Sequence, residues 1–440
     1  DRASDRLLTF VADNTQPEGW RYEPYYQQFF PTKLNAWVLM RDFNNDGRID
    51  IFTYNNIERG IRVFRNTTIV RGNLQFELAE NLIFSTLLSG TRTPLTLNSL
   101  DLPNISDIDG DGDLDVVNIE ITGNGFEFHK NLSMEQFGNP NQFKFEKITN
   151  CFGGVFSTTV CGQYTYAICR ENITETARPL VPNAVNHQGA TVLLAELNGD
   201  GNPDMILGDI SCPQAYFLAD SNSSTGFKYN RMSATYPASL SMGTVGNFAA
   251  GYHQDLDADG VNDLLITSNV PEEETLDHLQ KNNTFYYKNI GTNQSPNFQF
   301  QRNDWLYSQM LDLGGAAKPT VGDVDADGDL DIIVGSRGFI KNGFESSALV
   351  WLKNNGGFFQ YETGDWLGLS NWRKARIQPD FADLNHDGKP DLVVHYQASE
   401  ITRNSTIQVL FNLATGNQPW RFDTSAAVTC LLYTSDAADE

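Results

Sequence analysis

The sequence predicts an all-β fold, a β-propeller whose blades are four-stranded sheets, on three observations. An acidic nine-residue loop occurs six times in 440 residues, with about 60–65 residues between the starts of most copies. Each copy is followed by an apolar, β-rich run, and two further strand-like runs recur at fixed places behind it. This period is too long for most helical repeats and fits one four-stranded sheet per repeat.

The acidic loops define the repeats. Loops 1–6 read, in chain order, DFNNDGRID (42–50), DIDGDGDLD (107–115), ELNGDGNPD (196–204), DLDADGVND (255–263), DVDADGDLD (323–331) and DLNHDGKPD (383–391). We therefore expect loop-bearing repeats that begin near residues 36, 95, 191, 247, 317 and 377. Below, the nine residues of each loop are called positions 1–9.

Four strands can be assigned around each loop. A short apolar run precedes the loop and a β-rich run follows it, so the loop joins the first strand to the second. The third run ends in Asn or Asp, and the fourth is short and aromatic. The third runs end at Asn66, Asn131, Asp220, Asn289, Asn354 and Asn412.

The number of blades depends on the two ends of the chain. Residues 7–12, LLTFVA, resemble the aromatic last strand of a blade, yet they precede loop 1. The sixth repeat has a last strand of its own at 420–422. Seven blades are therefore preferred, with six as the alternative, and the chain is expected to be truncated. The propeller is assigned to residues 1–424.

Two segments depart from the repeat. An extra stretch at about 146–190 indicates an elaborated, Cys-containing insertion on the second blade. Residues 430–440 carry no strand pattern and resemble a translated sequencing adaptor. We therefore expect 425–440 to be an artefactual tail outside the domain, with a natural tail as the alternative.

The spacing within each loop predicts a cation site. Oxygen ligands at positions 1, 3 and 5, a main-chain carbonyl at 7 and a carboxylate at 9 would surround one ion, and Gly at 6 permits the sharp turn. Oxygen donors without His or Cys favour calcium over zinc or copper. The candidate ligands are Asp42, Asn44, Asp46, Arg48 and Asp50; Asp107, Asp109, Asp111, Asp113 and Asp115; Glu196, Asn198, Asp200, Asn202 and Asp204; Asp255, Asp257, Asp259, Val261 and Asp263; Asp323, Asp325, Asp327, Asp329 and Asp331; and Asp383, Asn385, Asp387, Lys389 and Asp391.

Charge supports the metal hypothesis. At positions 1, 3, 5 and 9, loops 2, 4 and 5 carry four carboxylates and loops 1, 3 and 6 carry three. So many carboxylates in one loop repel one another without a cation. We expect up to six Ca²⁺ ions, bound most tightly in loops 2, 4 and 5. The alternative is a set of Asp/Gly turns that bind no metal.

The residue at position 12, counted from the first residue of each loop, excludes an EF-hand. That motif needs a bidentate Glu there, on an emerging helix. Here the residues are mostly β formers: Thr53, Asn118, Leu207, Ile266, Val334 and Val394.

With these loops, the chain resembles the FG-GAP/VCBS repeat family of integrin-α-like, calcium-binding propellers over about residues 36–424. The VxDxDGDxD-like form of loops 2 and 5 is the best match. The phrases ILGDIS after loop 3 and IIVGSRG after loop 5 resemble the bacterial secreted branch of the family. The resemblance implies calcium binding, secretion or display at the cell surface, and an extracellular interaction, and it names no ligand.

Cysteine usage is compatible with that location. Four of the five cysteines lie within 62 residues, at Cys151, Cys161, Cys169 and Cys212. In a chain that resembles secreted proteins we expect two disulfides, of any of three connectivities. Free buried cysteines are the alternative, and zinc is disfavoured because no CxxC spacing occurs.

Three functions remain open. The first is an adhesion or recognition module for an extracellular protein or glycan. The second is a polysaccharide lyase or hydrolase, although the sequence shows no nucleophile elbow, zinc-hydrolase motif, phosphate loop or dinucleotide fingerprint, so we expect no enzyme. The third is a structural spacer. Trp20, Trp305 and Trp366 could stack on sugars, but packing within blades explains them more simply.

Composition narrows the partners. The formal net charge of −24 argues against nucleic acid and anionic membrane surfaces, since both attract positive charge. No run reaches the ~18 apolar residues of a membrane helix. No signal peptide is visible, and we expect that any signal or anchor lies outside this fragment.

Overall fold

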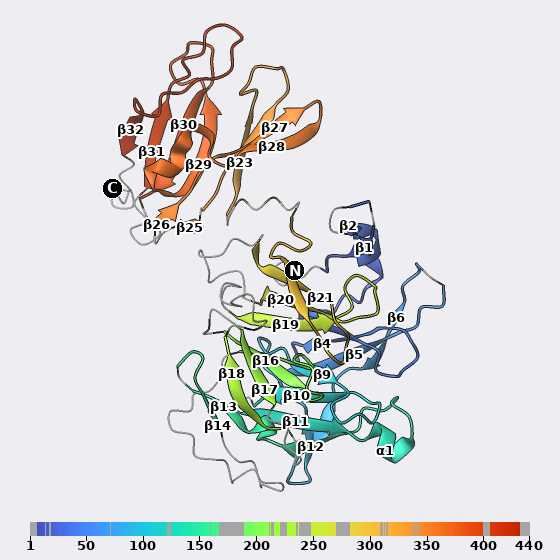
Figure 1. Cartoon of the computed structure of the whole chain (residues 1–440). Coiled ribbons are helices and arrows are strands. Elements are labelled where there is room, and N and C mark those ends of the chain that lie inside the picture. The colour runs from blue at the N-terminus through green and yellow to red at the C-terminus, as the bar shows by residue number, and fades with distance from the viewer. Residues whose placement is uncertain are drawn as a thin grey trace, which may run out of the picture. The chain divides into compact units, whose positions relative to one another are not determined.

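The structure is a computed structural model, which falls into two compact units (Figure 1). Unit 1 comprises Asp1–Glu274 and Asn282–Ser308, and unit 2 comprises Thr275–Lys281 and Gln309–Glu440. The structure describes residues 7–13, 15–16, 19–70, 72–120, 125–158, 160–166, 189–210, 212, 215–220, 227–234, 236, 248–269, 282–308, 311, 313, 316–337, 339–341, 344–398 and 405–431. Each unit is described by itself below.

Unit 1 contains four sheets built on the predicted plan. Their strands, in chain order, are β3 (Asn35–Arg41), β4 (Asp50–Asn55), β5 (Gly60–Asn66) and β6 (Phe76–Glu80); β9 (Asn104–Ser106), β10 (Asp115–Ile119), β11 (Phe126–Asn131) and β12 (Phe145–Thr149); β15 (Ala190–Ala195), β16 (Asp204–Asp209), β17 (Tyr216–Asp220) and β18 (Tyr229–Ser233); and β19 (Ala249–Gln254), β20 (Asp263–Ser268), β21 (Thr284–Asn289) and β22 (Phe298–Arg302). Within each sheet these strands pair antiparallel in chain order. The second sheet is extended to six strands by β7 (Phe84–Thr86) and β8 (Arg92–Pro94), because β12 pairs with β7 in parallel.

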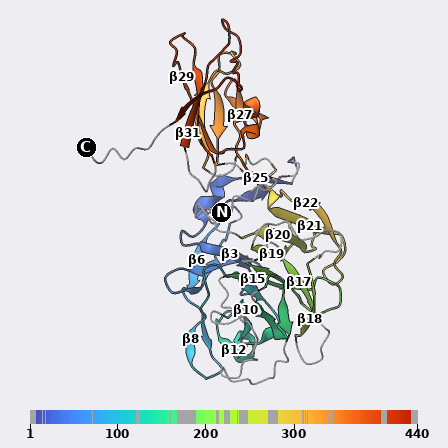
Figure 2. The ribbon, with the colours of Figure 1, turned by 90° about the vertical axis from the view of Figure 1, so that its left-hand side faces the viewer.

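The first strands of these sheets lie side by side, as the innermost strands of neighbouring blades do (Figure 2). β9 contacts both β3 and β15, and β15 contacts β19. Between the second and third sheets the backbone is bonded directly, with Leu102 N–H donating to Ala190 O at 2.9 Å and Val192 N–H donating to Leu102 O at 3.0 Å. The acidic loops that leave the ends of these first strands therefore share a common end of unit 1.

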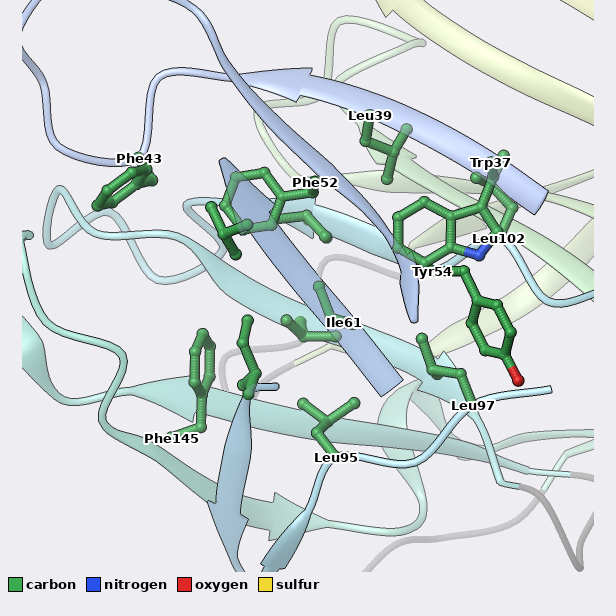
Figure 3. Close-up of a cluster of buried hydrophobic side chains, with 14 of the residues drawn as sticks. Trp37, Leu39, Phe43, Phe52, Tyr54, Ile61, Leu95, Leu97, Leu102 and Phe145 are labelled. Atoms are coloured by element: carbon green, nitrogen blue, oxygen red, sulfur yellow. The ribbon is translucent and has the colours of Figure 1, made fainter. Parts of the chain in front are cut away.

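The core lies between the sheets. In the cluster around Trp37, Phe52 and Ile61, side chains from the first sheet pack against Leu95, Leu97 and Leu102 of the following segment and against Phe145 (Figure 3). The apolar runs that predicted the strands thus supply the side chains that fill the space between successive sheets.

Unit 2 contains two more four-stranded sheets. Their strands are β23 (Lys318–Gly322), β24 (Asp331–Gly335), β27 (Val350–Asn355) and β28 (Phe358–Thr363), then β29 (Ala375–Ala382), β30 (Asp391–Gln397), β31 (Ser405–Leu410) and β32 (Val428–Leu431). The first strands β23 and β29 are again in contact. A hairpin of β25 (Phe339–Lys341) and β26 (Phe344–Ser346) is inserted after β24.

The predicted all-β class is confirmed. Helices in the described residues are short: η1 (Pro24–Phe29), α1 (Ser133–Phe137), η2 (Phe152–Gly154) and η4 (Trp366–Trp372). No described helix has both the length and the apolar character to span a membrane. Among the described residues, six sheets contain the four strands predicted for a repeat, four of them in unit 1 and two in unit 2. The preferred count of seven and the single domain over 1–424 stay predictions.

Both chain ends differ from expectation. Residues 7–12 supply β1 (Phe10–Ala12), which pairs with β2 (Trp20–Tyr22) in a separate hairpin, so in the described structure they are not the last strand of a blade. At the other end, β32 pairs with β31 and includes residues 430 and 431. The prediction that 430–440 lacks a strand, and that 420–422 is the last strand of the sixth repeat, was wrong. Phe422 makes only an isolated bridge to Asn412, and the edge of β31 is paired by the later segment instead.

The second-blade insertion carries a disulfide. It contains the hairpin of β13 (Val155–Ser157) and β14 (Tyr164–Tyr166), while 167–188 lies outside the described residues. Cys161 is bonded to Cys212 in the third blade, with 5.5 Å between their Cα atoms. Cys151 is disulfide-bonded as well, and Cys169 lies outside the described residues. The predicted disulfide bonding is therefore confirmed for Cys161 and Cys212, and the insertion is tied to the next blade.

Candidate metal centres

All six acidic loops share one backbone conformation. The predicted Gly at position 6 has a positive φ in every loop, between 81° and 100°. Position 4 is also left-handed, with φ of 56–86° at Asn45, Gly110, Gly199, Ala258, Ala326 and His386. The Gly at position 6 of every loop signalled the positive φ at that position. The left-handed conformation at position 4 was not predicted, because four of the six residues there are not glycine.

The carboxylate at position 1 closes the turn. It accepts a hydrogen bond from the N–H of the position-6 Gly at 2.5–3.1 Å in every loop. Glu196 does this in loop 3 through Oε2, so the longer side chain keeps the role that Asp has elsewhere. The position-5 Asp in turn accepts from the position-7 N–H at 2.9–3.1 Å. These contacts orient several carboxylates around one short segment.

The position-9 Asp joins the loop to the third strand. It is fully buried in all six loops and accepts the N–H of position 2 at 3.0–3.3 Å. In loops 1, 2, 4, 5 and 6, its other oxygen accepts the N–H of the Asn at the end of the third strand, at 2.7–2.9 Å. In loop 3, Asp204 Oδ1 accepts from Asn198 Nδ2 at 2.8 Å. Position 9 is therefore a structural link as well as a candidate ligand.

The recurring strand-end Asn completes this link. Asn289 is 2 % exposed, its Nδ2 donates to Asn262 O at 3.1 Å, and its Oδ1 accepts from Gly291 N–H at 2.9 Å. Asn66, Asn354 and Asn412 donate in the same way to the position-8 carbonyl of their own loops at 3.0–3.1 Å. The Asn pattern noticed in the sequence therefore fixes the acidic loop against the third strand.

Acidic side chains converge in loops 2, 4 and 5. Ligand atoms lie within 4.8 Å of one another in the groups Asp107, Asp109 and Asp115; Asp109, Asp111 and Glu135; Asp255, Asp257 and Asp259; and Asp323, Asp325 and Asp327. Glu135, on α1, was not predicted, because it follows loop 2 by twenty residues without any spacing signal. In loops 1, 3 and 6 the described side chains form no such group of three.

Loop 2 has the electrostatics of a cation site. Burial raises the pKa of Asp115 to about 8 and that of Asp113 to about 6. Asp113 Oδ1 is buried and accepts no hydrogen bond from the described residues. Carboxylates that are costly to ionise in the bare loop are stabilised when a hard cation is held among them. The donor set therefore fits calcium.

The aspartates at position 7 use their side chains elsewhere. Asp113 Oδ2 accepts the N–H of Met134 on α1 at 2.8 Å, and Asp329 Oδ2 accepts the N–H of Gly356 at 2.9 Å. Their side chains thus anchor the turn after the third strand. One oxygen of each side chain is thereby engaged outside the loop, and the main-chain carbonyl of position 7 stays the ligand that the spacing predicts.

Three lysines lie among the candidate ligands, and the sequence interpretation missed them. Lys130 forms ion pairs with Asp109 and, at 3.5 Å, with Asp111. Lys288 pairs with Asp257 and Asp259, the latter at 2.9 Å. Lys353 pairs with Asp325 and, at 3.2 Å, Asp327. Each lysine directly precedes the strand-end Asn, so the dipeptide Lys-Asn was the available signal.

A Ser–His–Glu arrangement occurs in the second sheet. His129 Nδ1 is 2.7 Å from Ser85 Oγ, and His129 Nε2 is 3.2 Å from Glu127 Oε2. Ser85 is 1 % exposed and His129 is 3 % exposed, so no substrate reaches the hydroxyl in this structure. Lys147 Nζ donates to Glu127 Oε1 at 2.7 Å. The group is a buried polar network that fastens β7 to β11.

The tryptophans considered for sugar stacking take part in packing. Trp305 is 8 % exposed, and Trp20 meets it edge-on with ring centroids 6.3 Å apart. In unit 2, Trp366 packs between Phe381 and Phe422. These three side chains therefore contribute to packing, which is the simpler of the two interpretations of the sequence.

Comparison with known proteins identifies the repeat. Residues 42–118, which hold loops 1 and 2, match the FG-GAP-like repeat. No curated protein matches the sequence.

Three solved structures share distant likeness. A lectin of Agrocybe aegerita that recognises non-reducing terminal N-acetylglucosamine is 14% identical, with a TM-score of 0.28 over 88% of this chain and 79% of the lectin. The fucose-specific lectin of Aleuria aurantia is 8% identical, with a TM-score of 0.25 over 85% and 89%. The biofilm matrix protein Bap1 of V. cholerae is 13% identical, with a TM-score of 0.20 over 89% and 58%. TM-scores this low carry no argument about the ligand of this chain.

Proposed function

Because the chain carries FG-GAP-like repeat sequence, we propose that it is a calcium-stabilised recognition module that works outside the cell. The observation that carries the proposal is the shared geometry of the six loops, in which hydrogen bonds from backbone N–H groups orient oxygen ligands around one short segment. The raised pKa values of Asp113 and Asp115 in loop 2 also support the proposal, because they indicate that ionising these carboxylates without a cation is unfavourable.

The ions would be held by positions 1, 3, 5 and 9 and by the position-7 carbonyl. When bound, calcium supplies positive charge that offsets the repulsion between the carboxylates. The chain's own residues do the positioning: Gly at position 6 makes the turn, and the strand-end Asn holds the loop on the third strand. Calcium would therefore stiffen the end of each unit that carries its loops.

The recognition role rests on architecture and charge. Blades bring loops from distant parts of the sequence to one end, where a protein or glycan can contact several at once. The net charge of −24 disfavours nucleic acid as the partner. The disulfide between Cys161 and Cys212 supports an oxidising, extracellular location. We propose binding rather than catalysis, since the triad-like group at Ser85 is buried.

Thermal unfolding tests calcium binding. We expect the melting temperature to be higher in millimolar calcium than in excess chelator, with equimolar magnesium as the control that restores little of the difference. At one hundred times its Kd, each ion stabilises by about 2.7 kcal/mol. Equal melting temperatures in calcium and chelator would reject the metal sites and leave the loops as Asp/Gly turns.

The recognition role is tested separately. The calcium-loaded protein is applied to a glycan array and to immobilised extracellular matrix proteins, and is incubated with polysaccharides whose reducing ends are measured. Calcium-dependent binding without cleavage supports a recognition module, cleavage would make it an enzyme, and neither binding nor cleavage would favour a structural spacer.

A further inference from the structure

The six loops use two different devices to neutralise the same atom, Oδ2 of the position-5 Asp. In loops 1, 3 and 6 position 3 is Asn, and its amide donates to that oxygen at 3.0–3.2 Å. In loops 2, 4 and 5 position 3 is Asp and offers no donor. There a lysine ammonium from the end of the third strand contacts the oxygen instead, at 2.9–3.5 Å.

The two devices follow position 3, except that loop 1 combines them, because Arg48 and Arg65 also lie 2.7 Å and 3.7 Å from Asp46 Oδ2. The residue before the strand-end Asn or Asp is Lys130, Lys288 or Lys353 where position 3 is Asp. Where position 3 is Asn, it is Arg65, Ala219 or Phe411. At positions 1, 3, 5 and 9, the four carboxylates of loops 2, 4 and 5 together with one lysine ammonium carry a formal charge of minus three. The three carboxylates at the same positions of loops 3 and 6 also carry minus three.

The lysine ammonium groups lie where a divalent ion would interact most favourably with the carboxylates. Each lysine also pairs with the position-3 Asp, so it bridges two of the predicted calcium ligands. A lysine ammonium is charged at neutral pH, since its ordinary pKa is about 10.4. Two cations cannot share these oxygens without strong repulsion.

We propose that Lys130, Lys288 and Lys353 are internal counter-ions that calcium must displace from positions 3 and 5 of loops 2, 4 and 5. The inference rests on the calcium sites proposed above and adds what sets their affinity. It revises the expectation from carboxylate count alone: the fourth carboxylate does not make these loops the tightest sites, because its charge is already balanced. It also explains how the loops remain folded before metal binds.

The test replaces each lysine by Met, which keeps the length of the side chain and removes the charge. Lys130→Met, Lys288→Met and Lys353→Met are titrated with calcium against a fluorescent chelator. We expect one site in each variant to bind roughly threefold to tenfold more tightly, the range for a screened charge at close distance. Lys144→Met, an exposed lysine of the second blade, is the control for net charge and should leave the affinities unchanged.

Thermal melting separates competition from a merely structural role. The Lys→Met variants should melt lower than wild type in chelator and no lower than wild type in calcium. A structural lysine would lower melting equally in both. Unchanged affinity, or an equal fall in both conditions, would overturn the inference while leaving the calcium sites intact. If no variant and no wild-type protein binds calcium, the proposed function itself fails, which is a distinguishable result.

Loop 6 allows the reciprocal experiment. Asn385→Asp creates a loop with four carboxylates at positions 1, 3, 5 and 9 and no lysine at the end of the third strand, and it should bind calcium more tightly than wild type. Adding Phe411→Lys at the partly exposed strand end should return the affinity toward the wild-type value. A double variant that binds as tightly as Asn385→Asp alone would contradict the proposal.

Discussion

A carboxylate in these loops has a role set by its position. The position-3 Asp109 faces other carboxylates and Lys130, whereas Asp113, four residues later, is fully buried and caps the backbone of Met134. The same residue type therefore serves as a candidate ligand at one position and as a fold-stabilising acceptor at the other. The spacing alone assigns no role to the side chain at position 7, whereas the burial of Asp113 shows that this side chain stabilises the fold.

Alanine substitutions should separate these roles. Asp109→Ala removes a candidate ligand, so it should lower the melting temperature in calcium and change it little in chelator. Asp113→Ala removes a backbone acceptor and should cost about 1 kcal/mol in both conditions. Melting curves of the two variants, each in calcium and in chelator, provide the comparison. If Asp113→Ala is silent in chelator, the capping role is wrong.

At the scale of the element, the acidic loop, the second strand and the end of the third strand form one hydrogen-bonded unit. Position 9 and the strand-end Asn make its links, and both could be predicted as recurring residues. The Gly turn and the strand order could be predicted too, because they depend on local periodicity. The lysine partners, Glu135 and the left-handed position 4 could not be predicted. The first two depend on contacts between segments, and the third on φ angles that non-Gly residues, the Ala of loops 4 and 5 above all, seldom adopt.

The second sheet contains the buried network whose pH dependence can be tested. Burial opposes ionisation of Glu127, but hydrogen bonding to His129 and the charge of Lys147 outweigh it and lower the pKa from 4.5 to about 2. The ionised carboxylate therefore stabilises the fold above pH 4.5, the unfolded value, and this contribution is lost as the pH falls toward 2.

Glu127→Gln isolates that contribution. At pH 7 the variant leaves the buried Lys147 without its carboxylate, which should lower the free energy of unfolding by about 3–5 kcal/mol. The difference from wild type should shrink below pH 4.5 and vanish near pH 2, measured by urea unfolding across this range. A difference that does not change with pH would show that the carboxylate is not ionised in the fold.

On the scale of the whole molecule, the six loops are distributed over two compact units. The sequence treats residues 1–424 as one series of similar repeats, yet loops 1–4 belong to unit 1 and loops 5 and 6 to unit 2. The buried clusters of the two units are separate in the described structure. A repeat pattern reports how each repeat is built, and it carries no information on how the repeats are grouped into compact units.

This division predicts two unfolding transitions in calorimetry. Asp325→Ala removes a candidate ligand of unit 2, so in calcium it should lower only one transition, by roughly 5–10 °C. Asp109→Ala should lower only the other. A single transition that moves as a whole in both variants would show that the units unfold together.

The hydrogen bond between position 1 and the Gly of position 6 has a consequence for how the protein ages. Every loop contains an Asp–Gly step, at residues 46–47, 111–112, 200–201, 259–260, 327–328 and 387–388. In a loose chain, the Gly nitrogen of such a step attacks the preceding side-chain carboxyl and rearranges it to isoaspartate. Here that nitrogen is held by the position-1 carboxylate, away from its neighbour. Isoaspartate at a given loop would therefore be a lasting chemical record that this loop had opened.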